Sequence, residues 1–184
     1  MRWTSLFSDL EGQFAAAEDA DLDAEVSDRT RREVATLRVH DRLRAAAGSA
    51  LTLDVLGAGV IHGVVEHVAV AWLLVSDDRR REALVPAAAL VGIRGLGALS
   101  ATPGSESEVE RRLGIGSPLR VIAQRREVVA VTLVNGATLH GVIGRVGADF
   151  FELAPRDVIA AHEPGAGPEL RTIPFAALGV VRPA

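Results

Sequence analysis

Apolar residues near the N-terminus of the chain recur at intervals of three and four residues. The first run consists of Trp3, Leu6, Phe7, Leu10 and Phe14. This spacing places the side chains on one face of a predicted helix. A second helix is predicted from Asp28 to Ala47, with Gly48 as a suitable stop. Its expected inward positions are Val34, Leu37, Leu43 and Ala46.

From Leu51 onwards the pattern changes to short segments in which apolar and polar residues alternate, which is typical of strands. Four segments up to Gly95 are predicted strands, namely LTLDVLGAG, VIHGVVEHV, AWLLVSD and EALVPAAALVGIRG. A polar turn is expected at residues 77–80. Short helices are expected at residues 105–113 and 117–126, before a second set of strands begins.

The second set of strands repeats the first. His62-Gly63 recurs 78 residues later as His140-Gly141, and the apolar positions around the two pairs match at the same offset. An insertion of ten residues in the second set changes the offset to 88, so that Ile93-Arg94 falls on Val181-Arg182. The insertion is rich in Pro and Gly, which predicts an extended hairpin loop. One small β-rich unit is therefore predicted to occur twice.

These patterns divide the chain into four predicted regions. Residues 1–48 form a helical N-terminal region with an acidic stretch, and residues 49–98 form the first small β-barrel. Residues 99–127 form a linker with short helices, and residues 128–184 form the second small β-barrel. The expected fold class is mainly β with N-terminal helices, in which each of two tandem barrels follows a helix.

The order of elements resembles SH3-like small barrels of the Sm-like type, the bacterial Hfq group included. The segment VTLVNGATLHGVIGRVGADFFEL carries most of this resemblance. Asn135-Gly136 favours a type I′ hairpin turn, and Gly63 and Gly141 lie where a mid-strand glycine permits the bend that closes a small barrel. The layout of the whole chain, opening MRWTSLFSDLEGQF, also resembles an uncharacterised actinobacterial family whose members sometimes carry a Fis-type transcriptional regulator label.

The Sm-like resemblance implies a regulatory protein that binds RNA or another nucleic acid. The family's first motif places an Asp six residues after its glycine, whereas this chain has Gly147 at that spacing. The Tyr-Lys-His signature near the last strands of the Hfq group is replaced by Ile173-Pro174-Phe175. The family's uridine-contacting residues are therefore carried over to no position of this chain.

Composition narrows the classes of function. The absence of cysteine excludes disulfides, thiolate metal sites and a cysteine nucleophile. The N-terminus lacks the pattern of a signal peptide, and no apolar stretch is long enough to span a bilayer, so we expect a cytoplasmic protein. No catalytic triad, phosphate loop or dinucleotide fingerprint is present. We expect no enzyme, no metal or cofactor and no small-molecule substrate.

Charge is distributed unevenly along the chain. The net charge is −4, but residues 1–28 hold one arginine against eight acids, so the rest of the chain has an excess of three bases. Every base is arginine, whose planar guanidinium suits bidentate contacts to phosphate. Candidate nucleic-acid contacts are Arg29, Arg31, Arg32, Arg38, Arg42, Arg44, Arg94 and Arg182. The runs Arg79–Arg81 and Arg125-Arg126 are expected to be solvated surface.

Two functions remain open at this stage. The arginines and the resemblance favour RNA binding, with the acidic N-terminal stretch competing for the same basic surface. The alternative is protein–protein interaction or self-association, which uses barrel edges and the apolar residues Trp3, Leu6, Phe7 and Leu10. His62 and His140 occupy equivalent positions, but no further metal ligands accompany them. They are therefore expected to serve packing or a backbone hydrogen bond.

Overall fold

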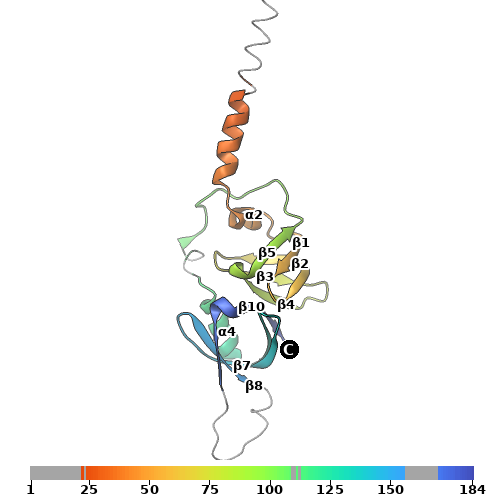
Figure 1. Cartoon of the computed structure of the whole chain (residues 1–184), viewed down its shortest axis with the longest axis vertical. Coiled ribbons are helices and arrows are strands. Elements are labelled where there is room, and N and C mark those ends of the chain that lie inside the picture. Colours follow the sequence, from red (N-terminus) through yellow and green to blue (C-terminus); the bar gives the residue numbers. More distant parts are fainter. Residues whose placement is uncertain (1–21, 23, 109–110, 112, 156–169) are drawn as a thin grey trace, which may run out of the picture. The chain divides into compact units, whose positions relative to one another are not determined.

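The computed structural model describes residues 22, 24–108, 111, 113–155 and 170–184 (Figure 1). The chain divides into two compact units, Met1–Arg38 and Val39–Ala184, and each is described by itself. The helix predicted around Trp3–Phe14 and most of the predicted insertion loop lie outside the described residues.

The single helix predicted from Asp28 to Ala47 is wrong. In the first unit residues 24–36 are helical, and α2 (Val39–Ala45) is a separate helix of the second unit. The N–H of Leu37 donates to the carbonyl of Val34 at 3.1 Å, the i−3 contact that often tightens the last turn of a helix. Val34 and Leu37 are 59% and 38% exposed, so they do not face inward as predicted, whereas Leu43 is buried.

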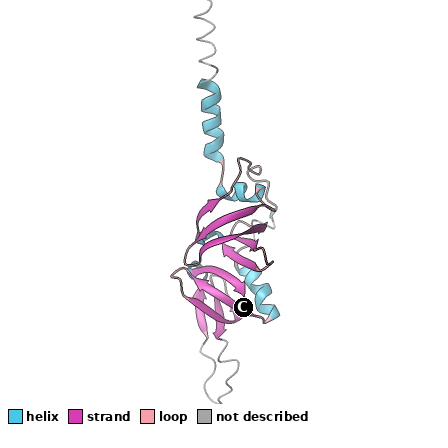
Figure 2. Cartoon of the chain, turned by 90° about the vertical axis from the view of Figure 1, so that its right-hand side faces the viewer, coloured by secondary structure: helices cyan, strands magenta, loops and turns pink. Residues whose placement is uncertain are grey.

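Ten antiparallel strands of the second unit form one sheet (Figure 2). Their order across the sheet is β5-β1-β2-β3-β4-β10-β6-β7-β8-β9. The strands are β1 (Ala50–Val55), β2 (Gly59–Val68), β3 (Trp72–Ser76), β4 (Glu82–Pro86), β5 (Leu90–Arg94), β6 (Val128–Leu133), β7 (Thr138–Val146), β8 (Phe150–Pro155), β9 (Arg171–Pro174) and β10 (Leu178–Pro183). The 3₁₀ turns η1 (Ala87–Ala89) and η2 (Phe175–Ala177) precede β5 and β10.

The strand register follows the repeat seen in the sequence. Strands β1–β5, the first copy, and β6–β10, the second copy, have the same order of neighbours. Leu73 lies opposite Val85 in the first copy, and their equivalents Phe151 and Ile173 lie opposite each other in the second. Even the irregularities match, because β5 and β10 each skip one residue in their pairing with β1 and β6. The duplication is therefore present in the structure as well as in the sequence.

The two copies share one sheet. Strands β4 and β10 pair antiparallel, with Leu84 opposite Val181, and this pairing joins the copies. Each copy has its own hydrophobic core, but the two cores exchange residues. Val180 of the second copy lies in the first core, and Trp72 of the first copy lies in the second. The mainly β fold class is confirmed.

A helix precedes each copy, as predicted. Helix α2 comes before β1, and α4 (Gly116–Arg125) comes before β6 (Figure 1). Leu119 anchors α4 because its side chain is fully buried in the second core. Arg126 adopts a left-handed conformation, with φ of 54°, and ends this helix.

The glycines of the two His-Gly pairs allow neighbouring strands to approach closely. A Cβ on Gly63 would lie 2.4 Å from the carbonyl oxygen of Ser76, and one on Gly141 would lie 2.2 Å from that of Ala154. Real Cβ atoms do not come so near a backbone oxygen, so each site excludes a side chain. The lack of room for a Cβ is therefore a sufficient reason for glycine at both positions.

The β6–β7 hairpin differs from the predicted type I′ turn. Its loop is three residues long, since the N–H of Leu133 donates to the carbonyl of Ala137 at 2.8 Å. Gly136 has a φ of 88°, but Asn135 is not left-handed, as a type I′ turn requires. Instead, the Asn135 side-chain oxygen accepts the Ala137 N–H at 3.0 Å. Such local bonding is common for asparagine in turns.

Candidate functional site

The β3–β4 turn is organised around one carboxylate. Asp77 Oδ1 accepts the backbone N–H groups of Arg79 and Arg81, each at 2.9 Å. The Arg81 guanidinium binds the other carboxylate oxygen, with Nε at 2.8 Å and Nη2 at 2.7 Å. These hydrogen bonds from Arg81 are the main reason that the pKa of Asp77 lies below its ordinary value. The carboxylate therefore stays ionised, and it holds the backbone of the turn and the side chain of Arg81 at the end of the hairpin.

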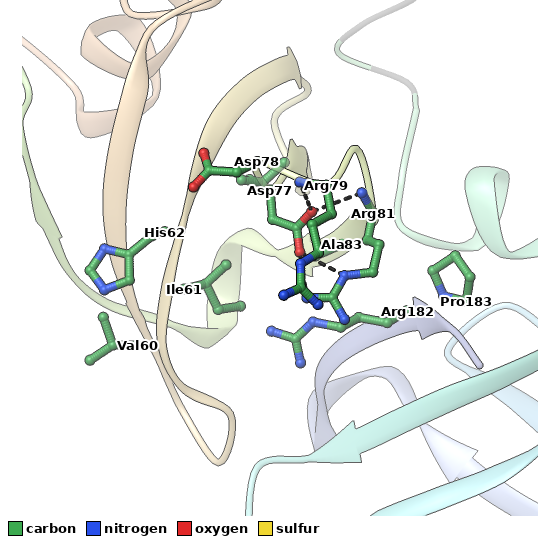
Figure 3. Close-up of a pocket in the computed structure, with 11 residues that line it drawn as sticks. Val60, Ile61, His62, Asp77, Asp78, Arg79, Arg81, Ala83, Arg182 and Pro183 are labelled. Atoms are coloured by element: carbon green, nitrogen blue, oxygen red, sulfur yellow. Dashed lines mark hydrogen bonds and ion pairs between the residues drawn. The ribbon is translucent and has the colours of Figure 1, made fainter.

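This turn borders a pocket with a volume of about 650 Å³. Strand β2 contributes one wall and the end of β10, from the second copy, contributes another. The pocket is thus formed where the copies meet. Its charged and titratable lining residues are His62, Asp77, Asp78, Arg79, Arg81 and Arg182. In Figure 3 the side chains of Arg79, Arg81 and Arg182 lie on the same side of the pocket, whereas His62 lies on the other.

The side chain of Arg182 has no ion-pair or hydrogen-bond partner among the described residues. Its guanidinium is about half buried. Burial lowers the pKa of Arg182, and the positive charge of Arg81 lowers it further, although Asp77 opposes both effects. Arginine nevertheless remains protonated in proteins. A partly desolvated cation without a counter-ion favours the binding of an anion from outside the chain.

The repeat explains why Arg182 lacks a partner. Its equivalent in the first copy, Arg94, forms an ion pair with Asp54 at 3.1 Å. The second-copy position that corresponds to Asp54 is Thr132, as the matching registers of β1 with β2 and β6 with β7 show. Thr132 contacts the hydroxyl of Thr138 at 3.2 Å instead. One acidic residue has thus been replaced, and the arginine that it would pair with lines the pocket.

The two repeated histidines have different surroundings. His62 is exposed, and its Nδ1 lies 2.9 Å from the hydroxyl of Thr52 on the neighbouring strand. His140 is also exposed, but it lies opposite Ala130, which has no hydroxyl. His140 and Arg171 line a smaller pocket of about 410 Å³ at the equivalent place in the second copy. Neither histidine is a core residue, so the expected packing role does not hold, and the hydrogen bond of His62 is to a side-chain hydroxyl rather than to the backbone as expected.

Four of the other predicted contact residues belong to the first unit. Arg29 and Arg31 form ion pairs with residues of their own helix, at 3.3 and 3.4 Å. Arg32 donates to the carbonyl of Asp28 at 3.3 Å, and Arg38 is exposed.

Arg42 and Arg44 serve internal contacts. Arg42 donates to the carbonyl of Gly97 at 2.8 Å. Arg44 donates to the hydroxyl of Ser105 at 3.1 Å and lies 3.6 Å from a carboxylate oxygen of Glu106. Both side chains thus hold α2 against the segment after β5. The predicted partner-binding residues Trp3, Leu6, Phe7 and Leu10 lie outside the described residues.

Sequence reasoning missed Arg79 and Arg81 because a run of charges usually indicates solvated surface. A signal was nonetheless present in the repeat. Aligning the two copies pairs Arg94 with Arg182 but Asp54 with Thr132, which marks Arg182 as the arginine that lost its acid.

Two further findings concern the described part of the chain. It contains no helix long and apolar enough to cross a membrane. Within the same residues, no three histidine, aspartate or glutamate side chains gather as a possible set of metal ligands. Comparison with known proteins adds no relative, since no family model, curated protein or solved structure matches this chain.

Proposed function

We propose that this chain is a regulatory protein without catalytic activity that binds single-stranded RNA through its phosphate groups. In this proposal each five-stranded copy is a small barrel of the Sm-like type, and the pocket between the copies is the contact site. Arg182 binds a phosphate directly, and Arg79 and Arg81 lie beside it. The observation that carries the proposal is the half-buried Arg182 without an ion-pair partner.

The chemistry of the pocket suits a phosphate better than a neutral ligand. Three guanidinium groups line it against the two carboxylates of Asp77 and Asp78, so the lining keeps a net positive charge of 3 − 2 = +1, and Asp77 neutralises Arg81. Hydrogen bonds between arginine and phosphate are charge-assisted and are often bidentate. The chain contains no tyrosine that could stack on a base. Phosphate contacts are therefore expected to dominate over base contacts. Such binding depends on salt and tolerates many sequences.

A matched pair of variants tests the proposal. Arg182→Gln removes the unpaired charge, and Arg94→Gln removes the equivalent arginine of the first copy, which is bound to Asp54. Binding of a fluorescein-labelled short RNA is measured by fluorescence anisotropy at several salt concentrations. Loss of one hydrogen bond to a charged group costs about 1.5–3 kcal/mol. We therefore expect Arg182→Gln to weaken binding roughly ten- to a hundredfold and to reduce the salt slope by about 1.

The control variant Arg94→Gln is expected to change RNA affinity little. Equal effects of the two substitutions would show that the contribution is only general surface charge. Absence of binding by the wild-type protein at low salt would refute the proposal outright. Circular dichroism of each variant confirms that the fold is retained.

Protein–protein interaction is the second candidate, and the two unpaired edges of the sheet support it. Among the strands that the structure describes, β5 and β9 each have a neighbour on one side only. An edge strand exposes backbone groups that can pair with an extended segment of a partner. This function predicts a complex that persists at high salt and is unchanged by Arg182→Gln. A complex that dissociates with rising salt would favour RNA binding instead.

A further inference from the structure

The two copies meet where β4 pairs with β10, a junction called the β4–β10 join below. At this join the backbones of the two copies come unusually close together. The β1–β2 turn of the first copy packs on the end of β6, where a Cβ on Gly57 would lie 2.0 Å from the carbonyl oxygen of Leu133. A Cβ on Gly179 of β10 would lie 2.6 Å from the carbonyl oxygen of Leu56. The join therefore needs a glycine on each side of the contact.

The free edges of the sheet belong to strands that are equivalent to those of the join. Strand β5 corresponds to β10, and β9 corresponds to β4. If the join were repeated between two chains, β9 of one would pair with β5 of the other. Thr172 would then lie opposite Ile93, just as Leu84 lies opposite Val181 within the chain. A contact of this head-to-tail kind generates rings or open filaments.

The first obstacle to such repetition is Val91. It occupies the same skipped position in β5 that Gly179 occupies in β10. Its side chain is 70% exposed on the free edge. In a repeated join the carbonyl oxygen of Val134, the equivalent of Leu56, would meet the Val91 Cβ at about the 2.6 Å found for a Cβ built on Gly179. Because the obstructing atom is backbone, a change of rotamer cannot relieve this contact.

The second obstacle is Asn135, which occupies the position of Gly57. The two turns differ in conformation, since Gly57 has a φ of 73° and Asn135 is not left-handed. The Asn135 side chain is also engaged in its own turn through the Ala137 N–H. The free end of the second copy thus has neither the small residue nor the backbone shape that the join uses.

We propose that Val91 and Asn135 prevent the β4–β10 join from repeating between chains, so that the protein is limited to two copies of its unit. Edge strands commonly carry features that block unwanted pairing, and here the block lies at the positions where the join requires glycine. The pocket that contains Arg182 then occurs once per chain, because its β10 wall is present only where one copy meets the next. The proposed limit to two copies rests on the glycine contacts alone and does not depend on RNA binding.

The proposal is tested by sedimentation velocity over a range of protein concentrations. The wild-type chain is expected to keep the 19.4 kDa mass of one chain throughout. The double variant Val91→Gly with Asn135→Gly is expected to gain mass as its concentration rises. The matched control, Val91→Ala with Asn135→Ala, keeps both Cβ atoms and should remain a single chain. A folded glycine variant that stays monomeric would overturn the proposal, as would a wild-type chain that forms oligomers.

A cysteine pair gives a second measurement, which does not require the glycine variant to be stable. The chain has no cysteine, so Ile93→Cys with Thr172→Cys introduces the only two thiols. Residues directly opposite on antiparallel strands are close enough for a disulfide. Under oxidation the wild-type background should give no ladder of linked chains, whereas the glycine background should give one. A ladder in the wild-type background would show that the free edges do pair.

Discussion

Replacing Gly141 by alanine tests whether the glycines of the repeated His-Gly pairs are required by close strand approach. The added Cβ would lie 2.2 Å from the carbonyl oxygen of Ala154 and 3.0 Å from its carbonyl carbon. Because both atoms belong to the backbone of β8, the strands must separate to admit it. Overpacking of this kind typically costs about 1–3 kcal/mol. For a chain of this size the melting temperature should fall by roughly 2–12 °C.

Gly144 provides the control on the same strand. A Cβ there would meet only the carbonyl oxygen of Glu152, at an ordinary 3.7 Å. Alanine at such a position restricts the unfolded chain and stabilises a protein by about 0.4–1 kcal/mol. Gly144→Ala should therefore leave the melting temperature unchanged or raise it by roughly 1–4 °C.

Thermal and urea unfolding, followed by far-ultraviolet circular dichroism, measures both variants. The reasoning is refuted if Gly141→Ala is as stable as the wild type, or if the two substitutions have the same effect. Gly63→Ala serves as an independent repetition, since the equivalent contact with Ser76 is 2.4 Å.

Two further predictions concern charge. Thr132→Asp restores the acid that the second copy lacks, and the new carboxylate should pair with Arg182. RNA binding should then weaken as strongly as it does in Arg182→Gln. Undiminished binding by the folded variant would contradict the explanation of why Arg182 is unpaired. The lowered pKa of Asp77 means that its contribution to stability is complete above the ordinary value of 3.8 and is lost as pH falls through the folded value. The stability difference between the wild type and Asp77→Asn should accordingly be largest near neutral pH and shrink in acid, and a difference independent of pH would exclude this role.

Local pattern was sufficient for much of the secondary structure. Strand periodicity and the offsets of 78 and 88 residues correctly placed His62 and His140 at equivalent positions, and the register of the strands follows those offsets. The helix before the second copy was also predicted close to its observed bounds. The break between the two helices at residues 37–38 was missed because the helical spacing of apolar residues, which includes Val34 and Leu37, continues through it. Both of these side chains are nevertheless exposed.

The candidate site was predictable only in part. Arg182 was among the predicted contact residues, but so were Arg42 and Arg94, which the structure shows bound to partners within the chain. The residues next to an arginine in the sequence do not reveal whether a carboxylate on a neighbouring strand lies close enough to pair with it. Arg79 and Arg81 were set aside for the same reason, since their proximity to Arg182 depends on contacts between distant segments.

The sequence by itself determined the duplicated unit, because alternation along each strand and the repeat offsets are written in local residue order. Only the tertiary structure decided how the two copies meet. The β4–β10 pairing joins residues as far apart in sequence as Leu84 and Val181, and no local periodicity specifies a contact at that separation. The pocket and the glycine contacts of the join follow from that pairing, because each needs atoms from both copies to lie close together.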